Sequence, residues 1–206
     1  MQKLLSFVLI SAFLFTQAVL ASELPESLIK GNELATEKKY EEAAKQYELA
    51  LKEQPQNVLI HLLLGLNYAN LGNFEPAIKH AKKAAELDPS YNSFYPLGLI
   101  YGKANNYPKA IESFDKALAL NPSSFMAEYQ KGIVCTAQEN YTEAISSYER
   151  ALKLNPEFTD ARLALAGAHL KKGDTTSALL QVEELKKMRQ DTLAEALNER
   201  IKEQKS

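Results

Sequence analysis

Few side chains in this 206-residue chain could carry nucleophilic or metal chemistry: one cysteine and three histidines. Cys135 is a candidate nucleophile, and His61, His80 and His169 are candidate bases or metal ligands. The sequence contains no Cys-X2-Cys or His-X3-His spacing and no acidic loop, so it offers no ligand set for zinc or calcium. Because the histidines are far apart in sequence, we expect them not to share a site.

Motifs for other reactions are also missing. The sequence has no glycine-rich phosphate-binding loop and no Gly-X-Ser-X-Gly nucleophile elbow. We therefore predict that the protein is not an enzyme and needs no metal or cofactor. The 24 basic and 26 acidic side chains are nearly balanced, which argues against a nucleic-acid partner.

The chain repeats one pattern of residue types with a nearly constant period. Each unit has two apolar stretches at helical spacing, a short polar break between them, and a proline at its end. In the unit 91–124, Phe94, Leu97 and Tyr101 lie on one face of a first helix, and Ala110 and Phe114 lie on one face of a second helix. Glycines recur in the first helices at a period of about 34 residues, as Gly31, Gly65, Gly98 and Gly132. A period of this length predicts a solenoid of stacked helix pairs.

The recurring small and cap-forming residues support this interpretation. Glycine costs a helix about 1 kcal/mol relative to alanine, so its recurrence indicates close packing between helices. Asn106 and Asn140 are expected N-caps, and Pro108 suits a first helical turn. A proline after the second helix stops it in four units, at Gln54-Pro55, Asp88-Pro89, Asn121-Pro122 and Asn155-Pro156.

The pattern resembles the tetratricopeptide repeat family in its glycine, the tyrosine three residues later, the two alanines and the closing proline. The resemblance implies an all-α, right-handed superhelical solenoid of antiparallel helix pairs, with about five units and a C-terminal capping helix. The predicted array is 22–190, with units 24–57, 58–90, 91–124, 125–158 and a degenerate unit 159–190. Residues 191–206 are predicted to form the capping helix and a frayed tail. Cys135 and His169 both occupy a core tyrosine position, so we expect a buried, inert thiol rather than an intermolecular disulfide, and a packed histidine.

In this family the first helices line the concave side of the solenoid. The resemblance therefore places an apolar groove at the following positions: Leu59, Leu62, Leu66, Tyr95, Leu99, Met126, Tyr129, Ile133 and Leu163. In the first unit it adds Leu28, Asn32 and Thr36. Some family members bind a terminal carboxylate through a clamp of Lys, Asn and Arg. Asn32 fits that clamp, but leucine, asparagine or proline stands at the other clamp positions, so we expect the clamp to be absent.

Two functions remain open. In the first, the protein is a scaffold or client holder that binds an apolar or amphipathic segment of another protein in the groove. In the second, it is a structural protomer that self-associates through the groove or the terminal helix. A third interpretation concerns the groove alone: tight stacking could bury its side chains between adjacent first helices.

Residues 1–21 are predicted to be a signal peptide. Lys3 precedes an apolar run from Leu4 to Phe15, and Val19-Leu20-Ala21 fits a cleavage site directly after Ala21. We expect an exported protein of the periplasm or cell envelope, or a secreted one. The alternative is an uncleaved N-terminal anchor, the one arrangement in which we expect contact with a membrane.

Overall fold

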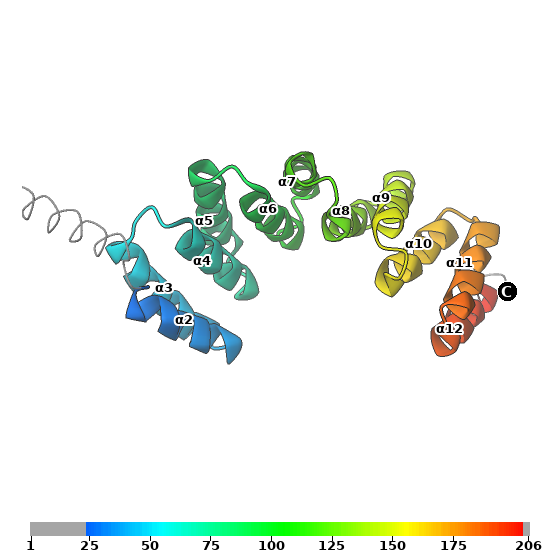
Figure 1. Cartoon of the computed structure of the whole chain (residues 1–206), viewed down its shortest axis with the longest axis horizontal. Helices are drawn as coiled ribbons and strands as arrows, with labels where there is room; N and C mark the ends of the chain where they lie inside the picture. The colour runs from blue at the N-terminus through cyan, green and yellow to red at the C-terminus, as the bar shows by residue number, and fades with distance from the viewer. Residues whose placement is uncertain (1–23, 204–206) are drawn as a thin grey trace, which may run out of the picture. The chain divides into compact units, whose positions relative to one another are not determined.

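A computed structural model describes residues 24–203, and over this range the chain forms eleven helices and no strand. The predicted all-α class is confirmed. The chain divides after Pro55 into two compact parts, an N-terminal part and a C-terminal part, which are described separately (Figure 1). Residues 1–21 lie outside the described residues, so the signal peptide and its cleavage after Ala21 stay predictions. None of the described helices combines the length and the apolar character needed to cross a bilayer.

The N-terminal part contains one helix pair, α2 (Glu26–Thr36) and α3 (Tyr40–Glu53). The ring of Tyr47, on α3, lies against the backbone of Gly31, on α2. The Tyr47 hydroxyl donates a hydrogen bond of 2.9 Å to Oδ1 of Asn32. The Tyr47 ring of the second helix is therefore buried against Gly31 of the first helix, which has no side chain.

The C-terminal part contains the other nine described helices. They are α4 (Val58–Asn70), α5 (Phe74–Leu87), α6 (Tyr91–Lys103), α7 (Tyr107–Leu120), α8 (Phe125–Ala137), α9 (Tyr141–Leu154), α10 (Thr159–Lys171), α11 (Thr175–Lys187) and α12 (Asp191–Glu203). Each helix packs against the next one along the chain, and the first helices α4, α6, α8 and α10 also contact one another in sequence (Figure 1). These first helices form a continuous surface, which we call the first-helix face.

The helix ends follow the local sequence signals. The side chain of Asn140 accepts a hydrogen bond from the Glu143 backbone N–H, and Asp174 accepts one from Ser177. Asn106 occupies the N-cap position of α7, but its side chain makes no capping hydrogen bond. The second helices α3, α5, α7 and α9 each end two residues before a proline, because the residue before proline is excluded from the helical conformation.

The periodic glycines fit against aromatic rings of the second helices. A Cβ atom on Gly98 would lie 2.7 Å from a ring carbon of Phe114, and one on Gly132 would lie 2.5 Å from a ring carbon of Tyr148. Both rings are buried, and each belongs to the second helix of the same unit as its glycine. The expected close approach between the two helices of a unit is confirmed, and it explains why these positions lack a side chain.

Gly167 occupies the corresponding helix of the fifth unit but has a different environment. A Cβ added there would meet no atom within 4 Å. We expect Gly167→Ala to stabilise the protein by about 1 kcal/mol through its higher helix propensity. We expect Gly132→Ala to destabilise it by about 1 kcal/mol or more, because overpacking the buried Tyr148 ring outweighs that gain. Urea unfolding of the two variants checks this, and equal shifts in the same direction would contradict it.

The last described helix, α12, packs against the end of the C-terminal part. A shared core joins α10, α11 and α12 through Ala166, Val182, Leu185, Leu197 and Ile201. Leu197 and Ile201 are buried and Leu193 is partly buried, so one face of α12 packs against this core. Helix α12 therefore covers the end of the fifth helix pair.

Candidate functional site

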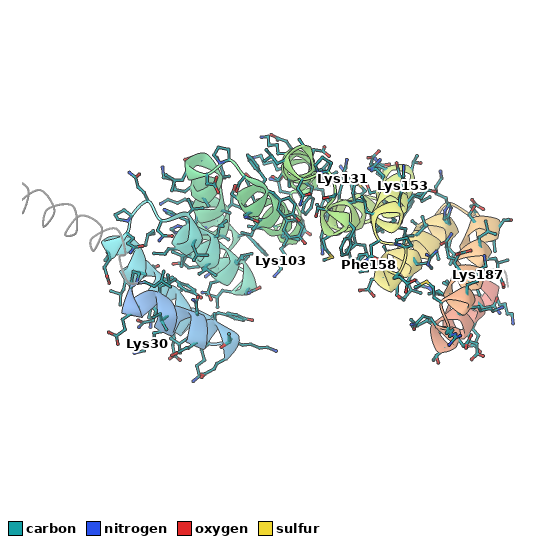
Figure 2. The ribbon with its side chains drawn as sticks, in the orientation of Figure 1. Lys30, Lys103, Lys131, Lys153, Phe158 and Lys187 are labelled. Atoms are coloured by element: carbon teal, nitrogen blue, oxygen red, sulfur yellow. The ribbon has the colours of Figure 1, made fainter. Side chains whose placement is uncertain are left out.

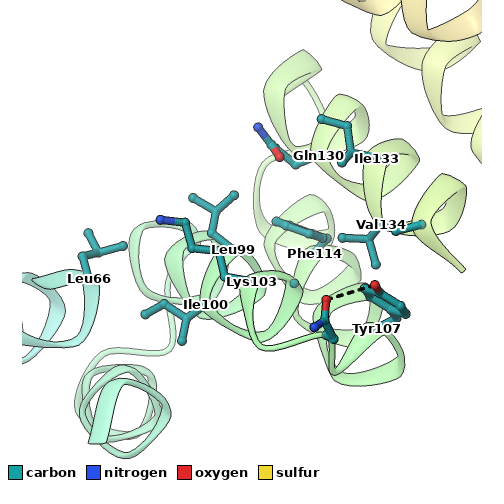
Figure 3. Close-up of a pocket in the computed structure, with 12 residues that line it drawn as sticks. Leu66, Leu99, Ile100, Lys103, Tyr107, Phe114, Gln130, Ile133 and Val134 are labelled. Atoms are coloured by element: carbon teal, nitrogen blue, oxygen red, sulfur yellow. Dashed lines mark hydrogen bonds between the residues drawn. The ribbon is translucent and has the colours of Figure 1, made fainter. Parts of the chain in front are cut away.

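A hollow of about 450 Å³ opens on the first-helix face. We call it the central hollow. Its apolar wall includes Leu66 from α4, Leu99 from α6, and Ile133 and Val134 from α8. Figure 3 shows these side chains coming from three separate helices, with the ring of Phe114 between α6 and α8. The hollow is therefore a product of stacking, since no single helix pair contains it.

The residues predicted to line the groove are accessible to solvent. Leu59 and Ile133 are 47% and 38% exposed, and the other seven are partly buried. None of the nine is sealed inside the core, in contrast to what tight stacking of adjacent first helices would produce. The structure brings Leu66, Leu99 and Ile133 together in the central hollow.

Two of the predicted aromatic residues are held in place by other rings. The Tyr95 ring lies 5.5 Å from that of Tyr91 and 5.9 Å from that of Phe114. Burial, and to a smaller degree the neighbouring Tyr91, raises the pKa of the Tyr95 hydroxyl above its ordinary value. A ring fixed in this way loses little conformational entropy on binding, which suits an anchor for an apolar partner.

Tyr129 has a similar setting one unit later. Its ring lies 4.8 Å from that of Phe158, a residue of the turn between α9 and α10 that Figure 2 labels. Burial, and to a smaller degree the carboxylate of Asp160, raises the pKa of the Tyr129 hydroxyl. Tyr129 and Leu163 line a second hollow of about 440 Å³, formed by α8, α9, α10 and α12, which we call the C-terminal hollow. The other predicted residues, Leu59, Leu62, Tyr95 and Met126, line neither hollow.

Polar groups stand at the rim of the central hollow. Lys103 is exposed, and its Nζ donates a hydrogen bond of 2.8 Å to Oδ1 of Asn70. Gln130, from α8, also lines the hollow (Figure 3). An apolar floor with a few polar groups at the edge is a typical composition for a protein-binding surface.

Two predictions from the sequence were wrong. Leu28 does not line an accessible surface; it is fully buried, on the same face of α2 as Gly31. His61 and His80 do meet: their Nδ1 atoms are 3.0 Å apart, across α4 and α5 of one unit. The same separation in sequence also joins Arg162 to Gln181, 3.3 Å apart across α10 and α11. A register comparison between units could have found this contact.

The predicted roles of Cys135 and His169 agree with the structure. Cys135 is fully buried with a free thiol, and burial raises its pKa to about 11. The thiolate is therefore scarce at neutral pH, and the sulfur is poorly reactive. The half-buried His169 lies with Nδ1 3.3 Å from Oδ2 of Asp174. Among residues 24–203 no three histidine, cysteine or acidic side chains are grouped so that they could hold a metal ion.

A partly buried ionic network among α7, α8 and α9 was not predicted. Lys131 is largely buried, with Nζ 2.8 Å from Asp115 and 3.3 Å from Glu143. Arg150 donates from Nε to the buried carboxylate of Glu128 at 2.9 Å. The network connects α7, α8 and α9 (Lys131 is labelled in Figure 2). Each pair joins a buried side chain to a partly exposed one, and pairs of this kind add little net stability, so we assign the network to fixing how these helices pack.

Family models match most of the described chain. Two models described as tetratricopeptide repeat match residues 30–92 and 136–201. A third, described as anaphase-promoting complex, cyclosome, subunit 3, matches residues 70–151.

Similar proteins are found among both curated sequences and solved structures. Hsp70-Hsp90 organizing protein 3 of Arabidopsis thaliana is 39% identical over 66 residues, which are 32% of this chain and 12% of that protein. This chain thus spans about an eighth of the length of that relative. A crystal structure of MamA is 27% identical, with a TM-score of 0.70, over 79% of this chain and 96% of that one. The type IV pilus biogenesis factor PilW shares the fold at 24% identity, with a TM-score of 0.73, over 86% and 84% of the two chains.

Proposed function

Because the chain is built of tetratricopeptide repeats, we propose that it is a non-enzymatic scaffold or client holder that binds an apolar or amphipathic segment of a partner protein. The binding surface is the first-helix face from Leu59 to Leu163. A repeat array of this fold is a protein-interaction scaffold; the partner's chemistry and its place of binding are the proposed part. Fold alone does not identify a partner, so the proposal rests on the surface itself.

The observation that carries the proposal is the open apolar wall of the central hollow. Leu66, Leu99 and Ile133 come from three successive first helices and all remain accessible to solvent. Partly exposed leucine and isoleucine side chains that gather in one concavity are a common mark of an interaction site. An amphipathic helix could place side chains at i, i+3 or i+4, and i+7 against such a row.

Site-specific photo-crosslinking tests the proposal. A photoreactive amino acid replaces Ile133 in one variant and Leu154 in a matched control. The two positions are similarly exposed, 38% and 42%, but Leu154 lies at the end of α9 and lines neither hollow. In cell extract, we expect a crosslinked partner from position 133 and none from position 154. Crosslinking from position 154 alone would refute the proposed surface.

Self-association is the competing function. Exposed leucines also occur on second helices, including Leu120 on α7 and Leu180 on α11, which are 53% and 59% exposed. These residues could support contact between copies of the chain. Sedimentation velocity over a hundredfold range of concentration distinguishes the two functions. A monomer at every concentration favours the scaffold, and a concentration-dependent dimer favours the structural protomer.

We also propose that the protein is exported to the periplasm or cell envelope, or secreted. The support is the sequence of residues 1–21, with its short basic start, apolar run and small residues before the expected cut. The intact mass of the protein isolated from its source tests this. A mass that begins at Ser22 supports export with cleavage, whereas a mass that includes residues 1–21 supports the anchored alternative.

A further inference from the structure

The apolar row on the first helices stops at α10. Leu66, Leu99 and Ile133 follow one another by one repeat period, and the next position in the series, one period further along, is Gly167. No atom would lie within 4 Å of a Cβ at this glycine. The missing side chain is thus not required by helix packing, and it leaves room in the C-terminal hollow, which Gly167 lines.

Two cations line the same hollow. Lys171 is at the end of α10, and Arg200 is near the end of α12. Short turns connect α10 to α11 and α11 to α12, so α10 and α12 run in the same direction and both cations lie near the C-terminal ends of their helices. Both side chains are exposed, and within residues 24–203 neither has an acidic partner. Helix α12 therefore lines the C-terminal hollow as well as covering the core.

The charge in the C-terminal hollow is unevenly distributed. Its acidic lining residue, Asp160, is in the first turn of α10, whereas Lys171 is the last residue of that helix. At 1.5 Å per residue the two positions are about 16 Å apart along the helix. One end of the hollow is thus acidic and the other end is basic, so a carboxylate would be attracted to the end with Lys171 and Arg200.

We infer that the basic end of the C-terminal hollow binds an acidic side chain of the partner segment whose apolar side chains occupy the central hollow. This inference rests on the proposed function. Neighbouring packed helices lie about 8–10 Å apart, so a segment in contact with Ile133 needs only that additional length to reach Gly167. The partner's aliphatic side chains match the row of Leu66, Leu99 and Ile133, and its carboxylate matches the two unpaired cations.

Selection from a phage-displayed library of random twelve-residue peptides tests the inference. The full-length protein is compared with the Lys171→Gln/Arg200→Gln variant and with the Leu66→Glu/Leu99→Glu variant. On the unchanged protein we expect enrichment of aliphatic residues together with Asp or Glu. The Lys171→Gln/Arg200→Gln variant should keep the aliphatic enrichment and lose the acidic one. The Leu66→Glu/Leu99→Glu variant should lose the aliphatic enrichment.

Synthetic peptides from the selected pool then measure the effect. Each is made with its acidic residue and with the matching amide, Glu→Gln or Asp→Asn. At low salt we expect the acidic peptide to bind the unchanged protein about tenfold more tightly than the amide, since two exposed ionic contacts contribute modestly and are screened by salt. This ratio should fall below about twofold for Lys171→Gln/Arg200→Gln, with the affinity of the amide peptide unchanged.

A variant at Gly167 provides an independent test. Gly167→Leu continues the aliphatic row and fills the C-terminal hollow without meeting a neighbouring atom at its Cβ. It should reduce the acidic preference while leaving helix content intact, and Gly167→Ala is the matched control with a smaller expected effect.

The outcomes separate the two hypotheses. Aliphatic enrichment that depends on Leu66 and Leu99, with no acidic preference, overturns this inference and leaves the proposed function standing. An acidic preference that survives Lys171→Gln/Arg200→Gln also overturns it. Failure to select any aliphatic peptide on the unchanged protein overturns the proposed function, and this inference with it.

Discussion

Replacing Leu66 and Leu99 together with glutamate is expected to lower the affinity for the partner segment by about 100-fold or more. Each leucine lies in the wall of the central hollow, where a bound apolar side chain would remove it from water. A carboxylate in that position would be buried without a partner, at a cost of about 1–3 kcal/mol for each substitution. Two such costs near the middle of this range correspond to more than a hundredfold in the dissociation constant.

The same double variant is expected to fold normally, because both leucines are only partly buried and glutamate can turn its carboxylate toward solvent. Circular dichroism measures the helix content, and isothermal titration with the crosslinked partner, once isolated, measures the affinity. Leu120→Glu/Leu154→Glu is the matched control, since these leucines are exposed and lie outside both hollows. Unchanged affinity in an intact Leu66→Glu/Leu99→Glu variant would refute the surface, whereas loss of folding would show that the two leucines are core residues.

The largest expected effect on stability is that of Phe114→Ala. The Phe114 side chain is fully buried, and its ring lies on the bare backbone of Gly98 and 5.9 Å from the Tyr95 ring. Truncating a buried phenylalanine removes its burial and leaves a cavity, which costs about 3–5 kcal/mol. The loss should be large here because Gly98 has no side chain that could move into the cavity.

Urea unfolding followed by circular dichroism measures this loss as a shift of the midpoint. Leu120→Ala, in the last turn of the same helix, is the control; this leucine is 53% exposed, and its truncation should change stability by no more than about 0.5 kcal/mol. A similar, small shift for both variants would mean that the ring of Phe114 does not hold α6 and α7 together.

Much of the fold could be predicted from the sequence because the period repeats the same local physics. Gly98 faces Phe114 and Gly132 faces Tyr148 at the same offset in sequence, and in each unit the pair brings two helices into contact. Prolines mark the ends of the second helices for a local steric reason. The accessible surface at Leu99 could also be anticipated, because its register position is shared by every first helix.

Features that depend on particular side chains and not on the shared pattern were not predicted. The His61–His80 contact could have been found only by comparing the register of several units, and nothing in the periodic pattern marks the Lys131 network. The contribution of Arg200 was missed because α12 was treated as a solvating cap. Leu28 was misplaced because the register of the accessible units was carried over to the first unit, where this position is buried.

Methyl NMR of the protein with labelled leucine and isoleucine side chains, titrated with the crosslinked partner, tests the proposed surface most directly. The account predicts chemical-shift changes at Leu66, Leu99 and Ile133 and none at Leu120 or Leu154. Changes confined to Leu120 and Leu154, with Leu66, Leu99 and Ile133 unaffected, would contradict it.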